Sequence, residues 1–210
     1  MWFKTLNLAG RALLPIVQGG MGVGISAHRL AGAVANENAV GTIASVNLRH
    51  HHPDLIDATD RCRDRDTIDQ ANRVALNREI RAAKDIAKSK GMVAVNVMKA
   101  VRDHAVLVSQ ACESGADAIV IGAGLPIDLP DMTADHPKVA LIPILSESRG
   151  VGIVLKKWLK RVVSLTPSLS STLPMQGGIW APPNSKKSTK SVLTSTCLLY
   201  TSDAAETSRV

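Results

Sequence analysis

Glycine clusters and single polar side chains stand directly after the apolar runs of this sequence, where they could hold a ligand. Residues 19–24 (Gly-Gly-Met-Gly-Val-Gly) follow the first run, Asn96 stands near the end of the third, and Gly122-Ala123-Gly124 follows the fourth. Glycine lets backbone N–H groups approach a flat or anionic ligand, because it carries no side chain. If the runs are parallel strands, their carboxyl ends meet at one rim. The spacing therefore predicts a binding site at that rim, with glycines that serve only as turn residues as the alternative.

The first glycine cluster also fits, formally, the fingerprint of nicotinamide-binding proteins. Gly22-x-Gly24-x-x-Ala27 matches G-x-G-x-x-A and opens a predicted helix. That motif needs an acidic residue at the end of the next strand, to bind the ribose hydroxyls. The next apolar run ends in Ile-Ala-Ser-Val-Asn, residues 43–47, which contains no acid. A nicotinamide site is therefore disfavoured.

Three consecutive histidines, His50, His51 and His52, are the residues that suggest a metal site. Consecutive residues rarely direct three ligands to one point, and no carboxylate stands at helical spacing to support them. We expect these histidines to lie in a solvated loop, and we expect no metal.

Strand-like and helical patterns alternate along residues 1–161. Continuous apolar runs predict strands over residues 13–18, 40–45, 93–98, 118–121 and 139–145, and helical spacing predicts helices over 27–35, 69–88, 101–113 and 151–160. Runs without polar alternation indicate strands covered on both faces, hence a parallel sheet with crossover helices. The pattern predicts an α/β fold. It is either an incomplete (βα)8 TIM barrel, with about five of eight βα units, or a doubly wound sheet.

Charge and cysteine content limit the classes of function. The net charge is +7, but the charges are interspersed and aromatic residues make up only 2% of the chain. A nucleic-acid site built on stacking needs aromatic residues beside basic ones, so we expect a solvated basic surface and no nucleic-acid partner. Three cysteines without a C-x-x-C pair favour a reducing, cytoplasmic setting. The longest apolar runs are too short for a membrane span.

The character of the sequence changes at Arg161. Serine and threonine account for 17 of the 49 residues in 162–210, against 12 of the 161 residues before them. No period of 2 or 3.6 is sustained in this tail, so neither a strand nor a helix is indicated. We predict that residues 1–161 form the folded part and that 162–210 are a non-native, disordered tail. The alternative is a natural Ser/Thr-rich disordered tail.

A shifted reading frame explains the tail. Back-translated and moved by one base, the codons available from Val162 onward can spell R-R-L-P-D-A-I-V-I-E, followed by A-G-G-H-L-G. Met175 and Trp180 have one codon each, and both fit. The shifted-frame sequence contains a strand-like run and a Gly-Gly-His turn, and residues 162–210 as given contain neither. Residues 197–205 look like a translated sequencing-library adapter.

Several motifs together resemble the nitronate monooxygenase family, formerly called 2-nitropropane dioxygenases. The matching text is P-I-V-Q-G-G-M-G at residues 15–22, V-G-T-I at 40–43, V-N-V-M at 95–98, the 122–126 turn, A-C-E-S-G-A-D-A at 111–118 and I-P-I-L-S at 142–146. Each motif is weak alone, but their order and spacing match across essentially all of residues 1–161. The hidden A-G-G-H falls where this family places its catalytic histidine.

The resemblance implies an FMN-dependent TIM barrel that oxidises alkyl nitronates with O2. It places Gly20, Met21 and Gly22 against the isoalloxazine and Asn96 on FMN. It sets Gly122 and Gly124 at the border of the flavin or the substrate. Flavin accepts the electrons in such enzymes, so the protein contributes the orientation of the reactants and the electrostatics around them.

The chain departs from the family in its catalytic residues. The family histidine has no visible counterpart, because its predicted codon straddles Gly178 and Ile179. We therefore assign no catalytic residue and expect an inactive fragment that lacks strands six to eight. Two alternatives remain open: a flavin-dependent enoyl reductase, or a non-catalytic module that binds an anion at its glycine rim.

Overall fold

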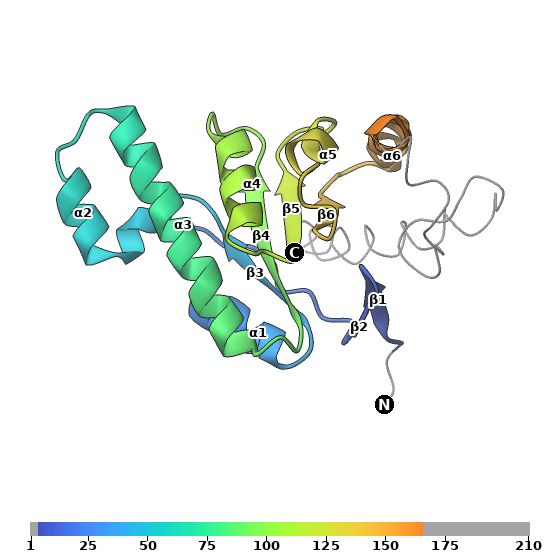
Figure 1. Cartoon of the computed structure of the whole chain (residues 1–210), viewed down its shortest axis with the longest axis horizontal. Coiled ribbons are helices and arrows are strands. Elements are labelled where there is room, and N and C mark those ends of the chain that lie inside the picture. The colour runs from blue at the N-terminus through green and yellow to red at the C-terminus, as the bar shows by residue number, and fades with distance from the viewer. Residues whose placement is uncertain (1–3, 166–210) are drawn as a thin grey trace, which may run out of the picture.

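A parallel sheet with helices against it forms the described part of the protein, residues 4–165 of a computed structural model (Figure 1). In chain order the elements are β1 (Leu6–Leu8), β2 (Arg11–Leu13), α1 (His28–Asn36), β3 (Val40–Ala44), the 3-10 helix η1 (Leu48–His51), α2 (Pro53–Thr59), α3 (Arg65–Ala87), β4 (Met92–Met98), α4 (His104–Glu113), β5 (Ala118–Gly122), α5 (Leu129–Met132), β6 (Ala140–Pro143) and α6 (Ser148–Leu165).

The sheet contains four parallel strands in the order β3-β4-β5-β6. Its registers pair Val40 with Met92, Ala94 with Ala118, and Ala118 with Ala140. Each strand is joined to the next by a crossover that contains a helix, as parallel neighbours require. Strand order follows chain order without the reversal that marks a doubly wound sheet.

A further segment runs beside β3 in the place of a first parallel strand. Val17 bridges Val40, the Gln18 N–H donates to the Val40 carbonyl at 2.9 Å, and the Val40 N–H donates to the Ile16 carbonyl at 3.0 Å. Five parallel segments are thus each followed by a helix: α1, α3, α4, α5 and α6. This confirms the predicted α/β fold with about five of the eight units of a TIM barrel.

The two faces of the sheet pack against different partners, because side chains alternate along each strand. Ile43, Val95 and Ile121 point to one face, where they pack with α1, α3, α4 and α6. Ala94 and Val120 point to the other face, which is the interior of a barrel. There the β1–β2 hairpin covers the amino ends of the strands through two side chains, Leu8 and Leu13.

Helix α3 is the longest of the described helices, and its ends are set by local chemistry. The Asp64 carboxylate accepts from the Thr67 N–H at 3.0 Å, and the hydrogen bonds from Thr67 lower the pKa of that carboxyl. Lys88, at φ 48°, ends the helix in the left-handed region. The apolar stripe faces the sheet through Ala71, Ala75, Ile80, Ala83 and Ala87. The cap explains why the helix begins before the predicted residue 69.

Four features differ from the sequence expectation. The β1–β2 hairpin was not predicted, and residues 13–18 supply the end of β2 and an isolated bridge, not a continuous strand. Residues 48–59 hold η1 and α2, where a loop was expected at residues 50–52 and no helix was predicted after it. Helix α6 runs to Leu165, four residues beyond Arg161. The remaining residues of the predicted disordered tail lie outside the described part of the chain. Among the described helices, none combines the length and apolar character needed to cross a membrane.

Candidate functional site

Residues 19–24 form a turn between the first parallel segment and α1, and Ser26 fixes this turn from inside. The fully buried Ser26 hydroxyl accepts from the Met21 N–H at 2.7 Å and lies 3.1 Å from the Met21 carbonyl, to which it donates. The Met21 side chain remains 44% exposed. Ser26 therefore engages both the N–H and the carbonyl of Met21 and holds the turn in place, while the Met21 side chain stays exposed.

Gly20 and Asn96 are brought into direct contact. A methyl group on Gly20 would lie 2.6 Å from both Cβ and Nδ2 of Asn96. Asn96 follows Ala94 by two residues, so its side chain points to the barrel interior. Its carboxamide makes no hydrogen bond with any residue in 4–165. A free amide therefore faces the interior beside the glycine turn.

Gln18 joins the turn to β3 through its side chain. Its Nε2 donates to the Thr42 carbonyl at 3.2 Å, and the Thr42 N–H donates to its Oε1 at 2.9 Å. The carboxamide thus continues the strand pairing where the backbone of the turn departs. The buried Thr42 hydroxyl, on the interior face, has no hydrogen-bond partner among residues 4–165. Sequence reasoning missed Gln18; a polar residue ending an apolar run was the available signal.

The histidine segment is exposed at His50 and His51, as expected, but it forms the end of η1 and not a loop. The His51 ring packs on Gly24, where a methyl group would lie 1.3 Å from Nε2 of His51. Gly24 also has φ +69°, so both geometry and space require glycine there. Helix η1 carries His51 to this contact after β3.

A buried carboxylate holds the same segment from the other side. Glu79, 2% exposed, accepts from the His28 backbone N–H at 2.7 Å, and its Oε2 lies 2.7 Å from His28 Nδ1. Nε2 of His52 lies 3.1 Å from Oε1 of Glu79, without the angle of a hydrogen bond. We treat this contact as electrostatic. Glu79 therefore ties the start of α1 and the start of α2 to α3.

The second glycine turn lies at the end of β5. Gly122 is buried, and a methyl group there would lie 3.2 Å from Cβ of Ile144. Gly124, at φ +145°, lies beside the Lys99 side chain. Lys99 pairs with Asp128. Burial alone would raise the pKa of Asp128, but the hydrogen bond and charge of Lys99 outweigh it and lower that pKa.

The six residues predicted to bind a cofactor all lie at the carboxyl edge of the parallel segments. Gly20 and Asn96 touch, and Gly122 is the register partner of Met98, two residues beyond Asn96. The other three stand in exposed turns at this edge: Met21, Gly22 and Gly124. No group of three or more His, Cys, Asp or Glu side chains within the described residues is placed to hold a metal ion.

Parallel segments in chain order, each followed by a helix, define the class: part of a TIM barrel, a fold in which ligands bind at the strand carboxyl ends. The sequence profile of one family, described as nitronate monooxygenase, matches residues 9–182. The chain belongs to the nitronate monooxygenase family, a family of oxidoreductases. The match continues past Arg161, and the non-native origin of residues 162–210 stays a prediction.

A solved structure described as FabK from Thermotoga maritima is similar to part of the chain. It is 18% identical, with a TM-score of 0.49, and the similarity covers 68% of this chain and 37% of that one. The chain thus matches well under half the length of that protein. No curated protein matches the sequence.

Proposed function

We propose that this chain carries the flavin-side part of an FMN-dependent enzyme that oxidises alkyl nitronates with O2. The observation that carries the proposal is the contact between Gly20 and Asn96, where a glycine backbone and an unbonded amide meet on the interior face. The family supplies the expectation of FMN and of a nitronate substrate. The cysteine content supports a cytoplasmic setting.

The residues at this edge fit a flat, polar ring system. Nothing lies within 4 Å of the position that a Gly22 Cβ would take, so the backbone there is open to a ligand. The Thr42 hydroxyl is buried without a partner on the same face, and such a group costs free energy unless water or a ligand bonds to it. Glycine backbone, free amide and unpaired hydroxyl are suited to the carbonyls and ring nitrogens of a flavin.

In this proposal the residues of the edge position the turn and the flavin, and none of them transfers a proton. Ser26 fixes the Met21 peptide, Gln18 fixes the turn to β3, and Asn96 offers an amide donor and acceptor. FMN, when bound, supplies the electron acceptor. The family histidine has no counterpart in the sequence. We therefore propose that this polypeptide alone does not turn over a nitronate, since loss of a general base typically costs about 10²–10⁴ in rate.

The test compares two purified proteins: this chain, and the protein encoded when the frame after the Arg161 codon is shifted by one base. Bound flavin is measured by visible absorbance, and O2 uptake is measured with propane-2-nitronate. We expect the shifted-frame protein to hold FMN and consume O2, and this chain to consume none. Flavin-dependent reduction of an enoyl thioester without nitronate oxidation would support the enoyl reductase alternative. A colourless shifted-frame protein would support the non-catalytic alternative.

The role of the turn at residues 19–24 in flavin binding is tested by Gly22→Ala in the shifted-frame protein. Its methyl group meets no described protein atom within 4 Å, so folding is expected to be unchanged while FMN affinity falls at least about tenfold. Gly152→Ala is the matched control, because that position is also open but lies in α6. Equal FMN affinity in both variants would remove the turn from the flavin site.

A further inference from the structure

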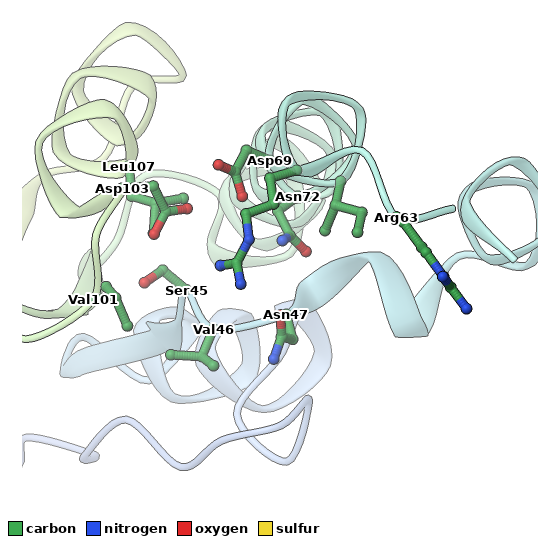
Figure 2. A pocket seen from close by; sticks show the side chains of 11 residues that line it. Ser45, Val46, Asn47, Arg63, Asp69, Asn72, Val101, Asp103 and Leu107 are labelled. Carbon is green, nitrogen blue, oxygen red and sulfur yellow. The ribbon is translucent and has the colours of Figure 1, made fainter. Parts of the chain in front are cut away.

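A cavity lies on the opposite face of the sheet from Asn96. It has a volume of about 410 Å³ and lies between α3 and α4, beyond the carboxyl ends of β3 and β4 (Figure 2). Ser45, which lines it, follows Ile43 by two residues and so shares its helix-facing side. The Ser45 N–H donates to the Asn96 carbonyl at 3.0 Å, so the two sites are back to back across the sheet.

The Ser45 hydroxyl is a buried polar group without a hydrogen-bond partner among the described residues. The side chain is 0% exposed, and its Oγ has no hydrogen bond within the described residues. Figure 2 shows this oxygen directed into the space beside Val101 and Asp103. A buried hydroxyl left unbonded costs about 1–3 kcal/mol, which a ligand in the cavity would recover.

Two opposite charges line the same cavity without partners. Asp103 is the N-cap residue of α4, but its carboxylate makes no capping bond and no ion pair within residues 4–165. Arg65, the first residue of α3, also lines the cavity and has no ion pair there. The two are farther apart than an ion pair, since no salt bridge joins them.

The other two charged residues of the lining do not complement Asp103 and Arg65: one is paired and one points away. Asp69 accepts from Arg102 at 2.8 Å, so its charge is balanced. Figure 2 shows the Arg63 side chain pointing away from Ser45 and Asp103. Apolar side chains complete the lining, among them Ile68 and Leu107.

We propose that this cavity binds a small zwitterion of the amino-acid type. The ligand carboxylate pairs with Arg65, its ammonium group pairs with Asp103, and its apolar side chain lies along Ile68 and Leu107. The Ser45 hydroxyl bonds to the carboxylate. A cavity of this size suits a small organic molecule, and charge-assisted hydrogen bonds at both ends give the specificity.

The separation of the two charges favours a zwitterion over a simple anion or amine. An anion would leave the half-buried Asp103 carboxylate beside it without a counter-ion, and an amine would leave the exposed Arg65 guanidinium without one. Desolvating a charge without pairing it is unfavourable. A ligand with both charges satisfies both groups at once.

The test uses the full chain without flavin, so its outcome does not depend on the proposed oxidoreductase activity. Binding is measured by saturation-transfer NMR with three probes: L-leucine, 4-methylpentanoate, which lacks its ammonium group, and 3-methylbutylamine, which lacks its carboxylate. We expect leucine to bind about tenfold more tightly than either analogue. In Asp103→Asn, leucine and 4-methylpentanoate should bind equally. In Arg65→Gln, leucine and 3-methylbutylamine should bind equally.

Three further variants keep the test decisive. Ser45→Ala removes only the hydroxyl and should weaken leucine severalfold, with an unchanged circular dichroism spectrum; it decides the question if a charge variant does not fold. Asp57→Asn and Arg29→Gln change exposed residues elsewhere and serve as charge-matched controls. Absence of leucine binding, tighter binding of either analogue, or a response of Ser45→Ala equal to that of the controls would overturn the proposal.

Discussion

Asn96 leaves no room for a side chain on Gly20. The two residues are far apart in the sequence, yet a Cβ on Gly20 would lie 2.6 Å from Cβ of Asn96. This contact ties the turn after the first parallel segment to the end of β4. It sets the distance between the two groups that the proposed cofactor would touch.

Gly20→Ala should destabilise the fold by about 1–3 kcal/mol, because overpacking displaces neighbouring atoms and Cβ of Asn96 cannot rotate away. The measurement is the free energy of unfolding in urea. Gly152→Ala is the control: it lies in α6 with nothing within 4 Å, and it should be neutral or up to about 1 kcal/mol more stable. Equal stability of the two variants would mean that Asn96 and Gly20 are not in contact.

Glu79→Gln should destabilise the fold by about 1–3 kcal/mol. The buried carboxylate accepts from the His28 N–H and faces the rings of His28 and His52. A glutamine amide has only one acceptor oxygen, so it cannot serve all three groups. Amide hydrogen exchange should also become faster in η1 and α2, since Glu79 contacts His52, the residue between these two helices. Glu37→Gln, at an exposed position after α1, is the matched control. If both variants unfold at the same urea concentration, Glu79 has no anchoring role.

Asp128 should make stability depend on pH at the acid end. Lys99 lowers the pKa of Asp128 in the folded state below its ordinary value of 3.8. The stabilisation is therefore present above 3.8 and is lost as pH falls through the lower folded-state value. Because the pair is partly exposed, its contribution should be under about 1 kcal/mol. As the pH is lowered to acid values, the free energy of unfolding should decrease less steeply for Asp128→Asn than for the exposed control Asp57→Asn.

The sequence predicted the strands, and it placed the candidate site residues at one edge of the sheet, because both depend on local patterns. Continuous apolar runs give β3, β4 and β5 nearly to the residue, since strands covered on both faces leave no polar alternation. The glycine turns and Asn96 were found for the same reason: they stand directly after those runs. Position relative to a strand end is readable without knowing the tertiary contacts.

Contacts between distant segments were not predictable in this way. Gln18 pairs with the backbone of Thr42 across 24 positions, and His28 meets Glu79 across 51. A glutamate in a helical pattern normally indicates a solvated face, so nothing local marked Glu79 as buried. The contacts of His51 and His52 were missed for the same reason, because their partners, Gly24 and Glu79, lie on other elements.

Cys112 should report whether this barrel portion is folded in solution. It is 4% exposed in the helix-facing core, and burial, aided by the charge of Glu113, raises its pKa to about 11. Only the thiolate reacts with alkylating reagents, so at pH of about 8 roughly one thiol in a thousand is reactive even before access is considered. In a Cys197→Ser background, mass spectrometry after iodoacetamide treatment should find the more accessible Cys62 modified at least about a hundredfold faster than Cys112. The difference should disappear in urea. Equal rates in native buffer would mean that α4 is not packed on the sheet, and the sites on both faces of that sheet would then have no fixed geometry.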